Sequence, residues 1–181
     1  SKNDKKCLQN DMQRGILQAS RTMGENLAAI RNRSGTQSGG IQMKRYLNEA
    51  LLYAVLSLVG GVFYREFTKI HGFVKKTTLE VVHTHYFILG MIVLLLLLLL
   101  EKNFSFTSPK TDRILVVYHA GLNLTAVMLM VRGVTQVLGT ALSSGMDAAI
   151  SGMAGIGHIL LGVSLVLLLL QIRRSISNAN A

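Results

Sequence analysis

The chain has 181 residues with no tryptophan, one proline and one cysteine, and aromatic residues make up only 6% of it. A single cysteine, Cys7, excludes a disulfide within the chain and a metal site built on cysteines. The sequence also lacks a nucleophile–base pair, a phosphate loop and a dinucleotide fingerprint, so it points to no familiar enzyme class. The glycine run around 152–157 lies inside an apolar stretch and is not a nucleotide-binding loop.

Acidic residues are also few, because 9 Asp and Glu stand against 19 Lys and Arg and give a net charge of +10. In a soluble protein such a charge favours nucleic acid as a partner. Here the basic residues flank long apolar blocks, so orientation in a membrane explains them better. We therefore expect a lipid bilayer, and no nucleic acid, as the partner.

The abundant feature is apolar residues in blocks, and half of the chain is hydrophobic. A helix that crosses a bilayer needs about 20 mostly apolar residues, because lipid offers no partner for backbone N–H and C=O groups. The sequence thus predicts an all-α fold, a four-helix transmembrane bundle. We place the membrane domain at 43–174 and a C-terminal tail at 175–181. The predicted spans are 46–64, 82–100, 114–139 and 150–172.

Residues 1–42 precede the first span and are polar, with mixed charge and the linker-like stretch SGTQSGG. They contain no apolar block and therefore no signal peptide. The codons of Gly39 and Gly40 can spell a ribosome-binding sequence, which Ile-Gln would separate from a start codon at Met43. We interpret 1–42 as a disordered, non-native leader. The alternative is a flexible native tail with a short helix near 16–31.

The basic residues also predict an orientation. With four spans, both termini and the 101–113 connection share one side of the membrane. With residues 1–42 set aside, the Lys and Arg outside the spans divide seven against four: Lys44, Arg45, Lys102, Lys110, Arg113, Arg173 and Arg174 against Arg65, Lys69, Lys75 and Lys76. Because cytoplasmic loops carry the excess of Lys and Arg, we expect a multi-pass protein of the bacterial inner membrane with cytoplasmic termini.

Four histidines and one arginine are ionisable residues that lie within the predicted spans, although an apolar span does not require them. His83 and His85 begin the second span, His119 lies near the inner end of the third, and His158 lies below the outer end of the fourth. Residues two apart on a helix point to nearly opposite sides, so one of the first two should face the bundle and the other the interface or outer loop. Arg132 lies in the outer half of the third span, where a charge usually marks a pair, a cavity or a ligand.

Polar and small residues also recur on one face of three spans, at helical spacing. Such stripes usually face the bundle interior, where Gly and Ser let helices approach closely, and we interpret most of the glycines in this way. The stripes are Tyr46, Glu49, Tyr53, Ser57, Gly60 and Tyr64; Gly121, Thr125, Met128, Arg132, Gln136 and Gly139; and Ser151, Gly155, His158 and Gly162.

Six segments carry a resemblance to a known family: KRYLNEALLYAVLSLVGGVFYREFTK, TTLEVVHTHYFILGM, LLLEKNFSF, VVYHAGLNLT, VRGVTQVLGT and SGMAGIGHILLGVSL. From Met43 to about Arg174 the chain resembles a small family of bacterial four-span membrane proteins classed as a domain of unknown function. This resemblance implies an integral membrane protein with no established ligand. More weakly, HTHYFILGM resembles the His-x-His-x-x-x-x-Gly helix starts of haem–copper oxidase-type membrane proteins, where such histidines ligate haem iron. The other spans of such an oxidase are not recognisable.

The first functional hypothesis is a small b-type haem protein for electron transfer or haem sensing. Histidines on facing helices can hold a haem inside a bundle, and small residues make room for the macrocycle. His85 and His158 are the predicted axial ligands, with His83 as an alternative, and Arg132 would pair with a propionate. His119 lies too far toward the other side for the same iron. It would hold a second cofactor or hydrogen-bond across the bundle, through Asn123.

Copper or zinc on His85 or His83 together with His158 is the second hypothesis. Such a metal needs about three ligands, and His71 in the outer loop would supply the third.

A transporter or channel-like element is the third hypothesis, with Arg132, Gln136 and the tyrosines along a polar path. A chain of this size would then form a homo-oligomer or join a partner membrane subunit, for which Gly60 and Gly61 offer a packing surface. A structural membrane subunit without a cofactor is the remaining alternative.

Overall fold

The computed structural model describes residues 2–179, with side chains for 39–178 and, before them, for 14, 17, 18 and 20–25. This described part contains helices and no strand, which confirms the all-α prediction. The elements are α1 (Lys2–Ile70), α2 (Leu79–His85), the π-helix η1 (Tyr86–Ile92), α3 (Val93–Phe104), α4 (Pro109–Val137) and α5 (Ser144–Ala179).

The chain divides into two units, Ser1–Ile41 and Gln42–Ala181. The first unit is the N-terminal part of α1, and its described side chains are exposed up to residue 25. The helix begins at Lys2, so it includes the stretch in which the sequence alone predicts disorder or a short helix near 16–31.

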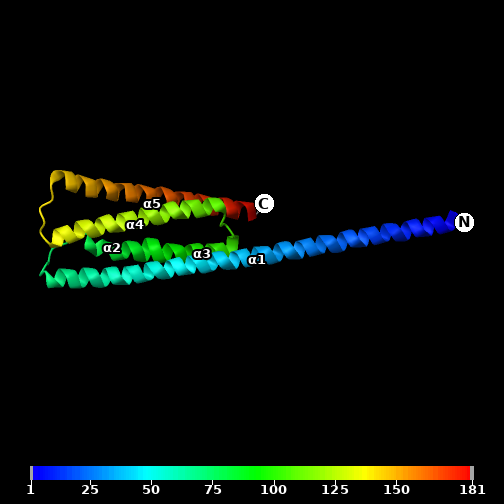
Figure 1. The fold of residues 1–181 in the computed structure, drawn as a ribbon, viewed down its shortest axis with the longest axis horizontal. Helices are drawn as coiled ribbons and strands as arrows, with labels where there is room; N and C mark the ends of the chain where they lie inside the picture. Colours follow the sequence, from blue (N-terminus) through cyan, green and yellow to red (C-terminus); the bar gives the residue numbers. More distant parts are fainter. Residues whose placement is uncertain (1, 180–181) are drawn as a thin grey trace. The chain divides into compact units, whose positions relative to one another are not determined.

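The second unit contains four helical segments that run alternately in opposite directions (Figure 1). They are α1 from residue 42, the continuous α2–η1–α3 segment, α4 and α5. The connections 71–78 and 138–143 lie together at one end of this unit, which we call the His71 end. The connection 105–108 lies at the opposite end, which we call the Pro109 end.

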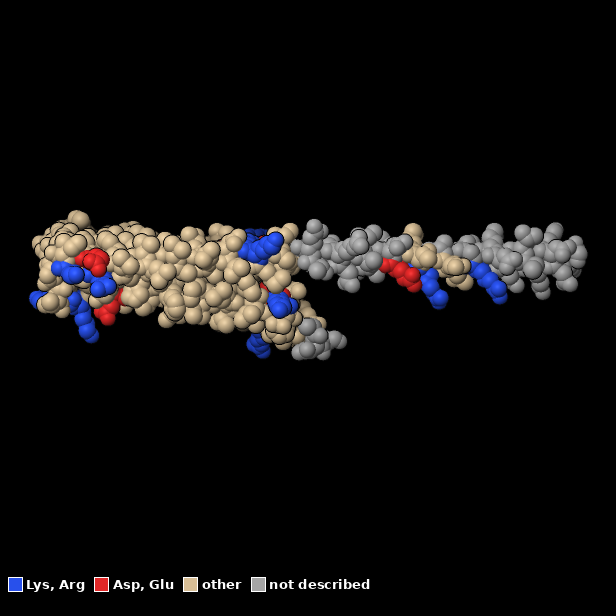
Figure 2. All heavy atoms as spheres, turned by 90° about the horizontal axis from the view of Figure 1, so that it is seen from below, with Lys and Arg blue, Asp and Glu red and all other residues tan. Residues whose placement is uncertain are grey.

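Four segments are long and apolar enough to cross a membrane: Gly39–Ile70, Leu79–Phe104, Pro109–Leu138 and Ser144–Asn178. Only 22% to 33% of their most apolar windows is buried in the protein, so most of this apolar surface faces outward, where lipid suits it and water does not. Figure 2 shows the charged side chains of the second unit at its two ends, with an uncharged band between them on that face. The protein is therefore a multi-pass membrane protein in contact with the bilayer.

Local sequence sets the ends of these helices. Ser108 and Thr111 form a capping box, in which each side-chain oxygen accepts the backbone N–H of the other residue (3.3 and 3.2 Å). Pro109 follows at the first helical turn, where its missing N–H has no cost. Gly139 leaves α4 with φ +63°, a conformation that glycine adopts without strain, and the predicted third span extends to this residue.

Glycine also sets the distance between α4 and α5. A Cβ on Gly121 would lie 2.6 Å from the backbone nitrogen of Leu161 and 3.0 Å from the carbonyl oxygen of Gly157. Neither backbone atom can move without shifting the whole helix. These two glycines therefore bring α4 and α5 into direct backbone contact, which positions every side chain that α5 presents to the bundle.

The second span changes from α to π geometry directly after His85, because η1 begins at Tyr86. Such π segments are rare and occur frequently at functional sites. Within η1, a Cβ on Gly90 would lie 2.6 Å from the side chain of Tyr53, so the glycine admits this tyrosine of α1. The π segment therefore adjoins Tyr53, whose hydroxyl lies 2.8 Å from Nδ1 of His119 on α4.

Candidate functional site

His85 on α2 and His158 on α5 lie side by side, although they come from different helices. Their ring centroids are 5.8 Å apart and their planes meet at 88°. His85 is half-buried and His158 is exposed, so the two imidazoles lie at the outer, lipid-facing side of the second unit. We call these two residues the histidine pair.

Both imidazoles of the histidine pair use the same nitrogen to bond their own helix. The Nδ1 of His85 lies 2.7 Å from the carbonyl oxygen of Val81, and the Nδ1 of His158 lies 2.8 Å from that of Ala154. A carbonyl oxygen can only accept, so each Nδ1 carries the hydrogen and each neutral ring has its lone pair on Nε2. Among the described residues, neither Nε2 has a hydrogen-bond partner.

The surface of α5 around His158 is open. Gly155 and Gly162, three residues before and four after it, share its helix face, and a Cβ on either would meet nothing within 4 Å. Sequence reasoning interprets these glycines as packing residues, but packing against another helix needs neither of them. They leave flat space on both sides of the imidazole.

His83 faces a different helix from His85. Its ring stacks on Tyr64 of α1 at 6.4 Å, and a Cβ on Gly60 would lie 3.6 Å from its side chain. Ser57 donates a hydrogen bond of 2.8 Å to its carbonyl oxygen. Its Nδ1 is buried without a hydrogen-bond partner among the described residues, and the ring borders a mostly apolar cavity of about 470 Å³ between α1 and the α2–η1 segment. His83 therefore faces α1 and His85 faces α5, in line with the different directions that their spacing of two residues predicts.

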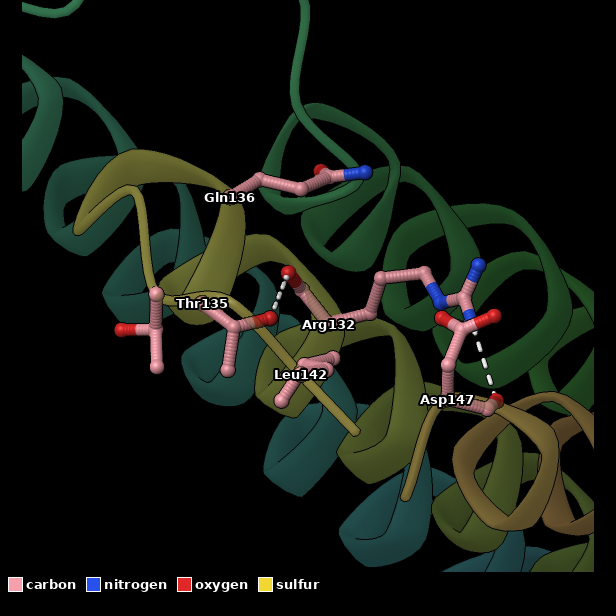
Figure 3. A pocket seen from close by; sticks show the side chains of 6 residues that line it. Arg132, Thr135, Gln136, Leu142 and Asp147 are labelled. Carbon is pink, nitrogen blue, oxygen red and sulfur yellow. Dashed lines mark hydrogen bonds and ion pairs between the residues drawn. The ribbon is translucent and has the colours of Figure 1, made fainter. Parts of the chain in front are cut away.

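Arg132 is paired within the protein, as Figure 3 shows. Its Nη2 donates to Oδ1 of Asp147 (2.9 Å) and to Oγ of Ser151 (2.6 Å), both on α5. The group borders a cavity of about 300 Å³ at the His71 end, which Gln136 also lines. Gln136 accepts the backbone N–H of Thr78 at 2.9 Å, so it serves to fix the start of α2.

His119 belongs to a separate cluster on α1 and α4. Its Nδ1 lies 2.8 Å from the hydroxyl of Tyr53, and its Nε2 lies 3.3 Å from Oε2 of Glu49. The rings of His119 and Tyr53 stack at 5.5 Å. We call Glu49, His119 and Tyr53 the inner triad.

Polar contacts continue from the inner triad in two directions. Toward the Pro109 end, Arg45 joins Glu49 (3.1 Å) to Asp112 (2.7 Å). Toward the middle of the bundle, Nδ2 of Asn123 donates to the Tyr53 hydroxyl (3.0 Å), and its Oδ1 accepts from Tyr86 of η1 (3.3 Å). The contacts form one continuous chain from a half-exposed ion pair to the π-helix.

The described side chains form no metal site with three protein ligands. In the part of the chain whose side chains are described, no group of three or more His, Cys, Asp or Glu residues could hold a metal ion. His71 is the suggested third ligand. Its Nδ1 instead bonds the carbonyl oxygen of Phe67 (2.8 Å), and its ring packs on the ring of Phe67.

Residues 43–175 match the model of a family described as Protein of unknown function (DUF2871). The chain belongs to this family. The match covers nearly all of the four-span unit and confirms the predicted resemblance. No curated protein and no solved structure matches the chain, so the likeness of HTHYFILGM to haem–copper oxidase helices has no support beyond the motif itself.

Both sites of this DUF2871 protein lie within the matched residues, but the sequence identifies them unequally. The histidine pair was predicted from depth and residue type. Within the inner triad, the sequence places Glu49 and Tyr53 on one stripe of the first span and gives neither of them a partner. The placement of Asn123 on the same helix face as His119 was the one usable signal, because residues four apart are neighbours.

Proposed function

We propose that the protein is a small b-type haem protein for electron transfer or haem sensing, with His85 and His158 as axial ligands. The observation that carries this proposal is the pair of adjacent imidazoles with unengaged Nε2 atoms. A histidine that ligates a metal almost always donates its other ring N–H to a carboxylate, carbonyl or water, as both residues do here.

The spacing of the rings suits one iron between them. Imidazole nitrogens bind metals at about 2 Å, so two histidines that hold one iron must lie close together. The ring centroids of His85 and His158 are 5.8 Å apart, so both residues would be within reach of one iron. Gly155 and Gly162 remove the side chains that would otherwise obstruct a flat macrocycle beside His158. When bound, the haem would supply one-electron redox chemistry.

The number of ligands favours haem over copper or zinc. A porphyrin brings four nitrogen ligands of its own, so its iron needs only one or two residues from the protein. A zinc or copper ion needs about three protein ligands. The described residues supply the histidine pair and no third candidate beside it.

Arg132 is the residue that we assign to a haem propionate. Its partner Ser151 precedes His158 by seven residues, which is two helical turns or about 10 Å along the same face of α5. The guanidinium therefore lies on the His71 side of the histidine pair. A propionate would compete with Asp147 for it, and this acidic side chain is 57% exposed and easily displaced.

We further propose that the protein lies in the bacterial inner membrane with its termini in the cytoplasm. The excess of seven basic residues over four at the Pro109 end supports this orientation. Reporter fusions test it: a fluorescent protein fused after Ala181 should fluoresce, and alkaline phosphatase there should be inactive. An active phosphatase would show that the C-terminus lies outside the cytoplasm and that the proposed orientation is wrong.

The test is an absorption spectrum of the purified full-length protein, oxidised and then reduced with dithionite, after expression with haem available. Sharp reduced α and β bands with a shifted Soret peak are expected. His85→Ala and His158→Ala should each abolish them, and His71→Ala should leave them unchanged. A featureless spectrum from folded protein would reject haem and leave metal binding, transport and a structural role.

A matched pair of glycine variants tests the open surface. Gly162→Leu places a side chain on the His158 face and should reduce haem content strongly. Gly152→Leu adds the same side chain at an equally open position on another face of α5, and should have no effect. Equal haem content in the two variants would show that the macrocycle does not lie on this surface.

A further inference from the structure

The inner triad has the atom order of a carboxylate–imidazole–hydroxyl relay. Asn123 is held by two more bonds, to the carbonyl oxygen of His119 (2.8 Å) and from Tyr86 (3.3 Å), so its Nδ2 donates to the oxygen of Tyr53. The hydroxyl hydrogen of Tyr53 is then free to donate to Nδ1 of His119. Neutral His119 therefore carries its own hydrogen on Nε2, which faces Glu49.

The charges around the contact between Glu49 and His119 do not sum to zero when His119 is neutral. Arg45 carries +1, while Asp112 and Glu49 carry −1 each, so the group has a net charge of −1. One more proton on Glu49 or His119 brings the sum to zero.

Other titratable groups near the triad do not compensate this charge. Each of them is either a tyrosine phenol or a carboxylate that already accepts hydrogen bonds or forms an ion pair. On η1 and α4, Tyr86 and Tyr118 are neutral, and on α3 Glu101 accepts two bonds from Thr107. The nearby titratable residues are Tyr46 and Tyr53 on α1, Tyr86 on η1, Glu101 on α3, and Asp112 and Tyr118 on α4.

The facing atoms of Glu49 and His119 are also incompletely bonded. Oε2 of Glu49 and Nε2 of His119 are buried and, among the described residues, lack a hydrogen bond of good geometry, although they lie only 3.3 Å apart. Their side chains as a whole are 27% and 23% exposed. Protons from water can thus reach both side chains.

We propose that Glu49 and His119 jointly bind one exchangeable proton, taken from water at the Pro109 end of the bundle. On binding, an O–H bond forms on Glu49 or an N–H bond on His119, and the bond that held the proton in hydronium breaks. Arg45 and Tyr53 are positioning residues, which hold the carboxylate and the imidazole in place. This site shares no residue with the histidine pair and does not depend on haem.

Infrared difference spectra of the full-length protein between mildly acidic and mildly alkaline buffer test the proposal. A carboxyl band and an imidazole band should change together, and isotope labels on Glu and His side chains identify them. Glu49→Gln and His119→Gln should each remove both bands, and the double variant should remove nothing more, because the proton is shared. Glu66→Gln and His71→Gln, at exposed positions, should leave both bands unchanged.

Two separate bands, each lost only in its own variant and additive in the double variant, would overturn the shared site. The absence of any pH-dependent carboxyl band would overturn proton binding there. Glu49→Asp keeps the charge and should retain a shifted band if Glu49→Gln does not fold. Tyr53→Phe should shift the imidazole band without abolishing it, whereas a purely structural hydroxyl would leave it in place.

Discussion

The histidine pair and the inner triad both place an imidazole in a membrane-spanning helix, but they use its nitrogen atoms in opposite ways. In the pair, one nitrogen of each ring bonds its own helix and the other has no partner in the described part of the chain. In the triad, both nitrogens of His119 face groups on α1.

This difference separates a ligand-type histidine from a connecting histidine. The triad joins α1 to α4, so its loss should weaken the fold. The pair lies on an outer surface and contributes little to packing, so its loss should remove a ligand and leave the fold intact. Stability and cofactor content are therefore independent measurements that the two sites should affect separately.

The largest stability effect is expected from Glu49→Leu. Removal of the carboxylate leaves Arg45 and His119 without their shared partner, and breaking one side of a buried pair costs about 3–5 kcal/mol. His158→Leu should change the free energy of unfolding by less than about 0.5 kcal/mol, because the residue is exposed. Denaturation in mixed micelles measures both, and similar values would remove the distinction between the two sites.

Gly121→Leu should come next, at about 3 kcal/mol, because its side chain would meet the backbone of α5. It should also displace His158 and lower haem content, while the infrared bands of the inner triad remain. Gly155→Ala is the control for stability, since its Cβ would meet nothing within 4 Å. Loss of the triad signal in Gly121→Leu would mean that the two sites are structurally coupled.

Tyr53→Phe should destabilise the protein by about 1–2 kcal/mol, because Nδ1 of His119 loses its bond and Asn123 loses an acceptor. Tyr64→Phe is the matched control on the same helix, since the ring of Tyr64 stacks on His83 and its hydroxyl has no hydrogen-bond partner among the described residues. Equal unfolding free energies for the two variants would show that the triad hydroxyl contributes nothing to stability.

The sequence predicts the histidine pair better than the inner triad for a physical reason. Apolar length fixes the spans, and the spans fix depth, so two histidines at one depth can be matched across helices. The triad depends on which face of α1 meets α4, and periodicity along one helix does not determine this. Glu49 also lies close to a span end, where a carboxylate is ordinary and attracts no notice.

The sequence predicts which glycines share a helix face, but it does not predict which of them contact a neighbouring helix. Gly121 and Gly157 meet backbone, while Gly155 and Gly162, on a similar stripe, meet nothing. Spacing alone cannot distinguish these cases, because both satisfy the same helical period. The π-helix after His85 escaped prediction for a related reason, since hydrophobic periodicity reports a face and not a local change in helix pitch.

Asp147→Asn should have the smallest effect on stability, below about 1 kcal/mol, because Asp147 is 57% exposed and such pairs are weak. It should nevertheless leave Arg132 with Ser151 alone and make its guanidinium more available to a propionate. We therefore expect unchanged or higher haem affinity in Asp147→Asn and lower affinity in Arg132→Gln, measured by haem titration of apoprotein. Equal affinities in both variants and the parent protein would remove Arg132 from the haem site and leave it as a surface link between α4 and α5.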